Sequence, residues 1–230
     1  ETPSGAHDVV ARRYTIGTNT LDNSVIIENQ GTETAAPRLV SDAAGNLLAA
    51  WSQSGVGVLV NRRAVGSAWS TDLTNVDSSG LPLEALRANA AGKAVALTSD
   101  RLGTAQASLL DLGASVVLQQ PAQAVANAYG SAPDALVDAS NRVHVFGVSV
   151  NSGDGSSQLF RWVYLPGSNG GWGAPEAVSA VNSSNFLTSG QGVTNPQVTA
   201  SDHRAVNGSA YCSRTVKRLT WAITPSQVSK

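Results

Sequence analysis

The sequence contains no methionine and a single cysteine, Cys212, in 230 residues. One cysteine excludes an internal disulfide and a cysteine-based zinc cluster. A catalytic thiol would need a partner, and the residues around Cys212 supply none, so we interpret it as a small apolar side chain in a strand. A chain that begins at Glu1 is compatible with a processed mature protein or with an excised fragment.

Charged residues are also scarce, at 13% of the chain, and the formal net charge is -1. A chain with so few charges and no excess of positive charge is not expected to bind nucleic acid or an anionic membrane surface. No apolar run approaches the roughly 18 residues of a membrane-spanning helix. A hydrophobic content of 42% predicts a folded chain with a sizeable core rather than disorder. Few lysines and glutamates among many small polar residues are typical of an extracellular or cell-surface bacterial β protein.

Most sequence motifs of catalysis are missing. We find no G-x-S-x-G elbow, no glycine-rich phosphate loop before a helix, and no strongly helical pattern. The histidines His7, His144 and His203 share no ligand spacing, so we interpret each as structural. The sequence therefore favours a protein that is not an enzyme.

What the chain does contain is a repeat. Its first copy is APRLVSDAAGNLLAAWSQ, residues 36–53, with Asp42 as anchor. Later copies place Asn89, Asp138 and Ser201 at the anchor, so the spacings are 47, 49 and 63 residues (42 to 89, 89 to 138, 138 to 201). A period of about 40–50 residues is typical of four-stranded propeller blades.

Each copy has the pattern of a strand, a tight turn and a second strand. An aspartate at the anchor can cap the turn, and Gly45 and Gly92 supply a residue with positive φ. Asn141 takes this place in the third copy, and asparagine tolerates the same conformation. The runs that follow are apolar on both faces, which predicts strands buried between stacked sheets.

We therefore predict an all-β fold, a single small β-propeller closed by strands from both ends of the chain. Four blades are favoured, and the alternatives are five blades or a piece of a larger ring. Closure would remove the open sheet edges. The predicted blades are 37–75, 84–120, 133–179 and 196–224, the N-terminal strands are 9–16 and 24–28, and the outermost blade strands are 68–73, 115–119 and 171–178.

The segments PRLVSDAAGNLLAAWSQ, LVNRRAVGSAW and FRWVYLPGSNGGWGAPEAVS resemble repeats of secreted or surface bacterial β-propellers that are distantly sialidase-like. In that family pattern, P-x-x-x-x-D-x-x-G-N leads into an apolar strand ending in tryptophan, and G-W-x-x-P-E forms an outer strand. The resemblance covers about residues 36–212 and implies a scaffold. The sialidase arginine cluster and the S-x-D-x-G-x-T-W box have no counterpart here.

Candidate ligand-binding residues come from the outer strands and from one loop. Trp69 and Trp172 occupy equivalent places in the first and third copies, where they either pack between blades or form a repeated platform for sugar rings. The Ser, Asn and Gly-rich segment 182–195 is predicted to be a surface loop, which adds Asn182 and Asn185.

A calcium ion is the one cofactor that the sequence suggests. Asp154, in the segment NSGDG, could bind it through oxygen ligands, although the twelve-residue EF-hand pattern is missing. Asp42 and Asp138 are better explained as turn caps than as an acid/base pair. A glycan hydrolase needs two carboxylates within about 5–10 Å of each other, and the sequence places these two far apart along the chain.

The favoured hypothesis is a secreted or cell-surface module that binds a glycan or a protein partner through loops at one face of the ring. A second hypothesis is a glycan hydrolase whose acids converge at the ring axis. A third is a structural subunit of a surface assembly, which oligomerises through its terminal strands.

Overall fold

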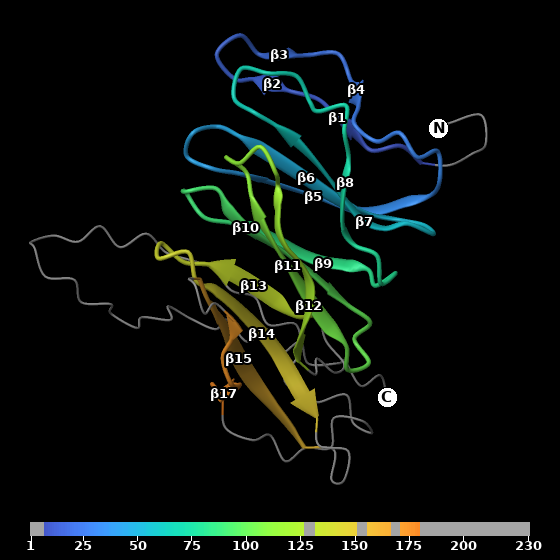
Figure 1. Ribbon diagram of the computed structural model, residues 1–230. Helices are drawn as coiled ribbons and strands as arrows, with labels where there is room; N and C mark the ends of the chain where they lie inside the picture. Colours follow the sequence, from blue (N-terminus) through green and yellow to red (C-terminus); the bar gives the residue numbers. More distant parts are fainter. Residues whose placement is uncertain (1–6, 127–131, 151–155, 167–170, 180–230) are drawn as a thin grey trace, which may run out of the picture.

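The computed structural model describes residues 7–126, 132–150, 156–166 and 171–179, and all their regular elements are β-strands. No helix in these ranges is long and apolar enough to cross a membrane. Three antiparallel sheets lie one on another, and two small two-stranded sheets, β1-β4 and β2-β3, lie beyond the first of them (Figure 1). We call these two small sheets the N-terminal hairpins. The prediction of an all-β chain is therefore confirmed for the described part.

The three stacked sheets are called sheet one, sheet two and sheet three. Sheet one has the order β5-β6-β7-β8, with β5 Thr34–Ser41, β6 Leu47–Gln53, β7 Gly57–Arg63 and β8 Thr74–Asp77. Sheet two has the order β9-β10-β11-β12, with β9 Leu83–Ala88, β10 Lys93–Ser99, β11 Ala105–Asp111 and β12 Leu118–Ala126. Sheet three comprises β13 Asp134–Val137, β14 Val143–Val150, β15 Ser157–Leu165, β16 Gly171–Trp172 and β17 Glu176–Ala177.

The first strand of each sheet lies beside the first strand of the next, because β9 contacts both β5 and β13. An apolar layer fills each interface. Side chains such as Leu48 and Leu86 pack between sheets one and two, and Val95 and Val145 pack between sheets two and three. In the middle of β10, Ala94 and Ala96 face sheet one and Val95 and Leu97 face sheet three, which explains a run that is apolar on both faces. Within the described ranges the sheets form an open stack.

The outermost strands differ most from the prediction. The expected strand 68–73 is reduced to a single bridge between Trp69 and Arg63, and the fourth strand is instead β8. Beside this bridge the N–H of Ser70 donates to the carbonyl of Arg62 at 2.9 Å, and the carbonyl of Ser70 accepts the side chain of Asn61 at 3.1 Å. The expected strand 115–119 begins later, as β12, and 171–178 is split into β16 and β17.

The N-terminal strands are shorter than predicted and pair only with one another in the described structure. Segment 9–16 holds β1 Val10–Ala11 and β2 Tyr14–Thr15, whereas 24–28 holds β4 Val25–Ile26. β1 pairs with β4, and β2 pairs with an additional strand, β3 Thr20–Leu21. The predicted fourth blade, 196–224, lies outside the described residues.

These hairpins are fastened to the outer face of sheet one. Val9 and Ile27 are buried against Ala49, Trp51 and Leu59. The Ile27 carbonyl also accepts a hydrogen bond of 2.8 Å from the buried side-chain nitrogen of Asn61. The N-terminal segment therefore covers part of a face that would otherwise meet water.

Gly57, the first residue of β7, provides a test of this packing. Its φ is 114°, and a Cβ there would lie 2.0 Å from the carbonyl oxygen of Asp77 in β8. We expect Gly57→Ala to lower the free energy of unfolding by about 3 kcal/mol through backbone strain and overpacking. Gly55→Ala is the matched control, because Gly55 also has positive φ, 74°, but no atom within 4 Å of its Cβ position. Urea denaturation measures both, and equal losses would contradict the steric explanation.

Candidate functional site

The first hairpin turn of each sheet is closed by its anchor residue. In sheet one, a carboxylate oxygen of Asp42 accepts the backbone N–H of Asn46 at 2.9 Å, and the other accepts the Asn46 side chain at 2.7 Å. Gly45, within this turn, has φ of 90°. The prediction that Asp42 caps this turn is confirmed.

The other two turns repeat this arrangement. The side-chain oxygen of Asn89 accepts the N–H of Lys93 at 3.0 Å, and a carboxylate oxygen of Asp138 accepts that of Arg142 at 2.9 Å. Positive φ recurs at Gly92, with 80°, and at Asn141, with 62°. Asparagine therefore fills the glycine position of the third turn, as the sequence predicts.

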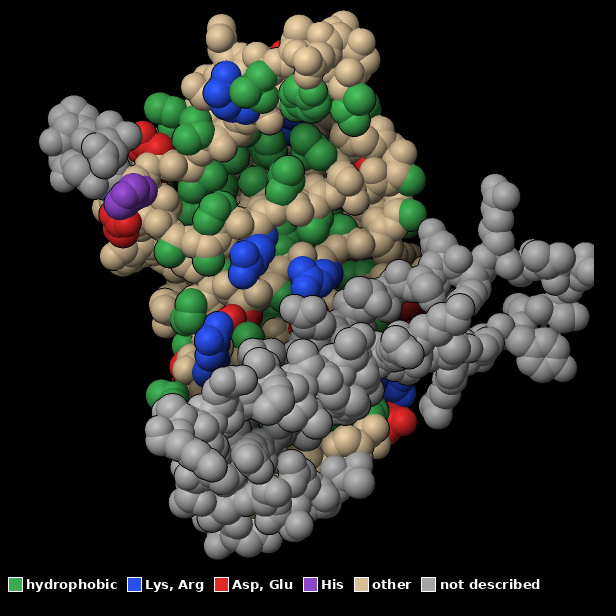
Figure 2. Space-filling view, turned by 180° about the vertical axis from the view of Figure 1, so that it is seen from behind, with side chains coloured by type: hydrophobic (Ala, Val, Ile, Leu, Met, Phe, Trp, Pro, Cys, Tyr) green, Lys and Arg blue, Asp and Glu red, His purple; other side chains and the backbone are tan. Residues whose placement is uncertain are grey.

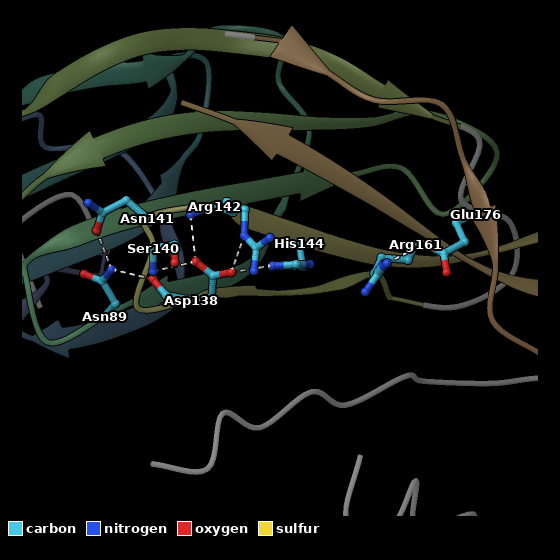
Figure 3. A network of polar contacts seen from close by, with 8 residues as sticks. All are labelled: Asn89, Asp138, Ser140, Asn141, Arg142, His144, Arg161 and Glu176. Carbon is cyan, nitrogen blue, oxygen red and sulfur yellow. Dashed lines mark hydrogen bonds and ion pairs between the residues drawn. The ribbon is translucent and has the colours of Figure 1, made fainter. Parts of the chain in front are cut away.

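The three turns also bind one another, which the sequence does not reveal. The N–H of Ala43 donates to the carbonyl of Ala90 at 3.0 Å and links turn one to turn two. The side-chain nitrogen of Asn89 donates to the carbonyl of Asp138 and to the side-chain oxygen of Asn141, both at 2.8 Å (Figure 3). We call this set of linked turns the turn row.

The third turn carries the densest cluster of charge. The Asp138 carboxylate lies 2.6 Å from Nε of Arg142 and 3.1 Å from Nε2 of His144. Burial would raise the pKa of Asp138, but the hydrogen bonds from His144 and Arg142 outweigh it and lower this pKa. For His144, burial is the main cause of a lowered pKa, and the charges of Arg161 and Arg142 add to it, whereas Asp138 opposes it. These groups are engaged in capping and pairing, so the turn row is a structural element.

A groove with both polar and apolar side chains lies on the outer face of sheet one. This groove, of about 780 Å³, separates this face from the N-terminal hairpins. Figure 2 shows hydrophobic side chains gathered between the hairpins and sheet one, with Lys or Arg side chains at the edge. Its lining includes the aromatic side chains of Tyr14 and Trp69 and four arginines, Arg12, Arg13, Arg38 and Arg63.

Two of these groups are fixed by neighbours. Asp22, the carboxylate of the groove lining, pairs with Nε of Arg13 at 2.9 Å. Nε of Arg63 donates to the carbonyl of Ser67 at 2.8 Å, which fixes the turn before Trp69. Tyr14 remains 53% exposed. The groove thus presents aromatic surface, several hydrogen-bond donors and one carboxylate.

Trp69 and Trp172 do occupy equivalent places in their sheets. Trp69 is paired with Arg63, and Trp172 is paired with Tyr164, at the matching end of the third strand. Their surroundings differ, however. The Trp172 ring packs edge-on against Tyr164 at 5.5 Å between centroids and belongs to the core between sheets two and three. Trp69 is likewise partly buried, against the core cluster beneath the N-terminal hairpins, but it also lines the groove. The repeated platform for sugar rings stays a prediction.

The other predicted site residues, Asn182, Asn185 and Asp154, lie outside the described residues, and so does Cys212. Among the described residues, no group of three or more His, Cys, Asp or Glu side chains could hold a metal ion. The calcium site at Asp154 stays a prediction.

Sequence reasoning missed Asn61, which organises the groove. Its side chain is buried, and its nitrogen donates both to Ile27 in the N-terminal segment and to Ser70 beside Trp69. The available signal was the single asparagine at the end of the run VLVN, which is otherwise apolar. An asparagine in a buried strand needs hydrogen-bond partners, so its position indicates a contact with another segment. Comparison of the sequence with models of known protein families and with curated proteins gives no match.

The links between turns two and three can be tested at Asn89. We expect Asn89→Ala to lower the free energy of unfolding by about 2 kcal/mol, because it removes the cap and both donated bonds. Asn89→Asp keeps an oxygen to cap Lys93 but loses the donor, so about 1 kcal/mol should be lost. Chemical denaturation distinguishes the cases. If Asn89→Asp is as stable as the parent, the links between the turns contribute nothing.

A pH-dependent test follows from His144. In the unfolded chain a histidine takes up its proton near pH 6.5, whereas folding lowers the pKa of His144. The unfolded state therefore binds more protons below about pH 6.5, and stability should fall as the pH falls. His144→Gln should remove this component, so the parent should lose stability relative to the variant between about pH 7 and pH 5. The exposed His7→Gln serves as control, and a stability difference that stays constant with pH would contradict the assignment.

Proposed function

We propose that the chain is a small β-propeller that acts as an extracellular binding module, with its ligand in the groove beside Trp69. The propeller is supported by three sheets of the same strand order, whose first strands lie side by side and whose first turns are linked in a row. Propellers are built by such radial repetition of four-stranded sheets.

The groove is the observation that carries the binding role. Ligand sites are concave and largely apolar, with a few polar groups that fix orientation. Here Tyr14 and Trp69 offer flat apolar rings, Arg38 and Arg63 offer donors, and Asp22 offers an acceptor. This combination suits a glycan, whose rings have apolar C–H faces and a rim of hydroxyl groups.

Catalysis finds less support in the described part of the chain. Hydrolysis by two carboxylates requires a close pair of acids facing a shared cavity. The carboxylates with clear roles are bound elsewhere: Asp138 caps a turn, Asp134 pairs with Arg87, and Glu84 pairs with Arg101. We therefore favour binding over hydrolysis.

A glycan array tests the proposal, run on the purified chain with and without calcium. We expect saturable binding that Trp69→Ala weakens at least about tenfold, the effect of losing roughly 1.4 kcal/mol. Trp172→Ala is the matched control, because that ring occupies the equivalent place but packs against Tyr164. Tyr14→Ala is a second groove variant. Because the Tyr14 side chain is exposed, its removal should leave the fold intact.

Three outcomes would contradict the glycan site. Binding that is lost in Trp172→Ala and kept in Trp69→Ala would place the site at sheet three. Binding unaffected by Trp69→Ala and Tyr14→Ala would remove the site from the groove. If the chain binds no glycan but binds a protein partner, and both groove variants lose that partner, the groove is a protein-binding site.

A further inference from the structure

We propose that the inner end of sheet one's outer face is the docking surface for residues 196–224 of the same chain, which add a further sheet there. This inference rests on the proposed propeller and identifies the contact that would close it. The surface is centred on Leu39 in β5 and Leu47 in β6, at the end of the groove farther from Trp69.

The repeat defines what these positions do elsewhere. Counted from the turns, Leu39 pairs with Ala49 in sheet one, Leu86 pairs with Ala96 in sheet two, and Ala135 pairs with Val145 in sheet three. Leu39, Leu86 and Ala135 are therefore the same position on the first strand of successive sheets. In sheets two and three, this position faces the preceding sheet.

Burial separates the first copy from the other two. Leu86 is 1% exposed and Ala135 is fully buried, whereas Leu39 is 62% exposed. Val9 and Ile27 cover Ala49 and Trp51 on this face but leave Leu39 open. A leucine at a position built to meet a preceding sheet therefore lacks that sheet among the described residues.

The other end of the stack also carries an apolar face, of which Val148 and Leu159 are already buried, at 0% and 1% exposed. On the face of sheet three that points away from sheet two, Phe146, Val148, Val150 and Leu159 form an apolar cluster. These four residues all come from β14 and β15. A single sheet that lay against this cluster and also covered Leu39 would close the stack into a ring and remove the exposed apolar surface at Leu39.

The chain supplies a suitable segment. The spacing between anchors is 47 and 49 residues for the described sheets (42 to 89, 89 to 138), and 180–230 adds 51 residues (230 − 180 + 1). The fourth copy of the repeat lies there, with Ser201 at the anchor. Leu219, Trp221 and Ile223 alternate along it in the way of a strand with one apolar face.

A pair of aspartate variants tests whether Leu39 is covered in the full chain. Val116 is the matched control, because it is 66% exposed and lies on a loop of sheet two. A carboxylate buried under a docked sheet is costly, so Leu39→Asp should lower Tm by about 8 °C or more. Val116→Asp should change Tm by no more than about 2 °C. Equal, small shifts for both variants would overturn the proposal.

Cross-linking identifies the occupant. Leu39→Cys and Val116→Cys each add a second thiol to the native Cys212, and a bismaleimide with a spacer of about 10 Å, the distance between packed sheets, can join them. We expect a cross-link within one chain, at a several-fold higher yield for Leu39→Cys than for Val116→Cys. A cross-linked dimer, together with a dimeric mass by light scattering, would make a second copy the occupant. Equal yields from both variants would show that no docking occurs.

These readouts separate this inference from the ligand assignment. A chain that binds glycans through Trp69 but melts equally with either aspartate would overturn the closure alone. A chain that gives the internal cross-link but binds no glycan would overturn the ligand alone.

Discussion

The structure depends on the capping of the first turn in every sheet. Asp42, Asn89 and Asp138 each close a turn of the same length by accepting the N–H four residues on. The capped turn sets the register of the first two strands, and register decides which side chains face which neighbour. Apolar residues then alternate toward the preceding and the following sheet, so a correct turn is a condition for stacking.

The turn row adds coupling between sheets. An asparagine at the second anchor can do what an aspartate cannot, because its amide nitrogen donates to turn three while its oxygen caps turn two. Ser108 makes a comparable link nearer the outer strands, by donating to the carbonyl of Val76 at 2.7 Å. The stack is thus held by apolar layers in the middle and by polar links on either side of them.

The N-terminal hairpins connect this scaffold to the proposed binding role. Their contact with sheet one uses two aliphatic side chains and the buried amide of Asn61, and it leaves a groove rather than a filled interface. Trp69 bridges to β7, whereas Leu39 belongs to β5, on the other side of β6. One groove can therefore serve a ligand at its outer end and a docked sheet at its inner end.

The sequence by itself determined the all-β class, the period of the repeat, the turn caps and the residues with positive φ, because each depends on local chemistry within a few residues. It also marked the inner strands through their apolar runs. Only the tertiary structure decided the outer strands, where the carbonyl of Ser70 is bound by the side chain of Asn61, a residue of β7. Tertiary structure likewise separated Trp69 from Trp172, since similar local patterns meet different neighbours. Trp69 packs against the N-terminal segment beside the groove, and Trp172 packs against Tyr164 and the core between sheets two and three.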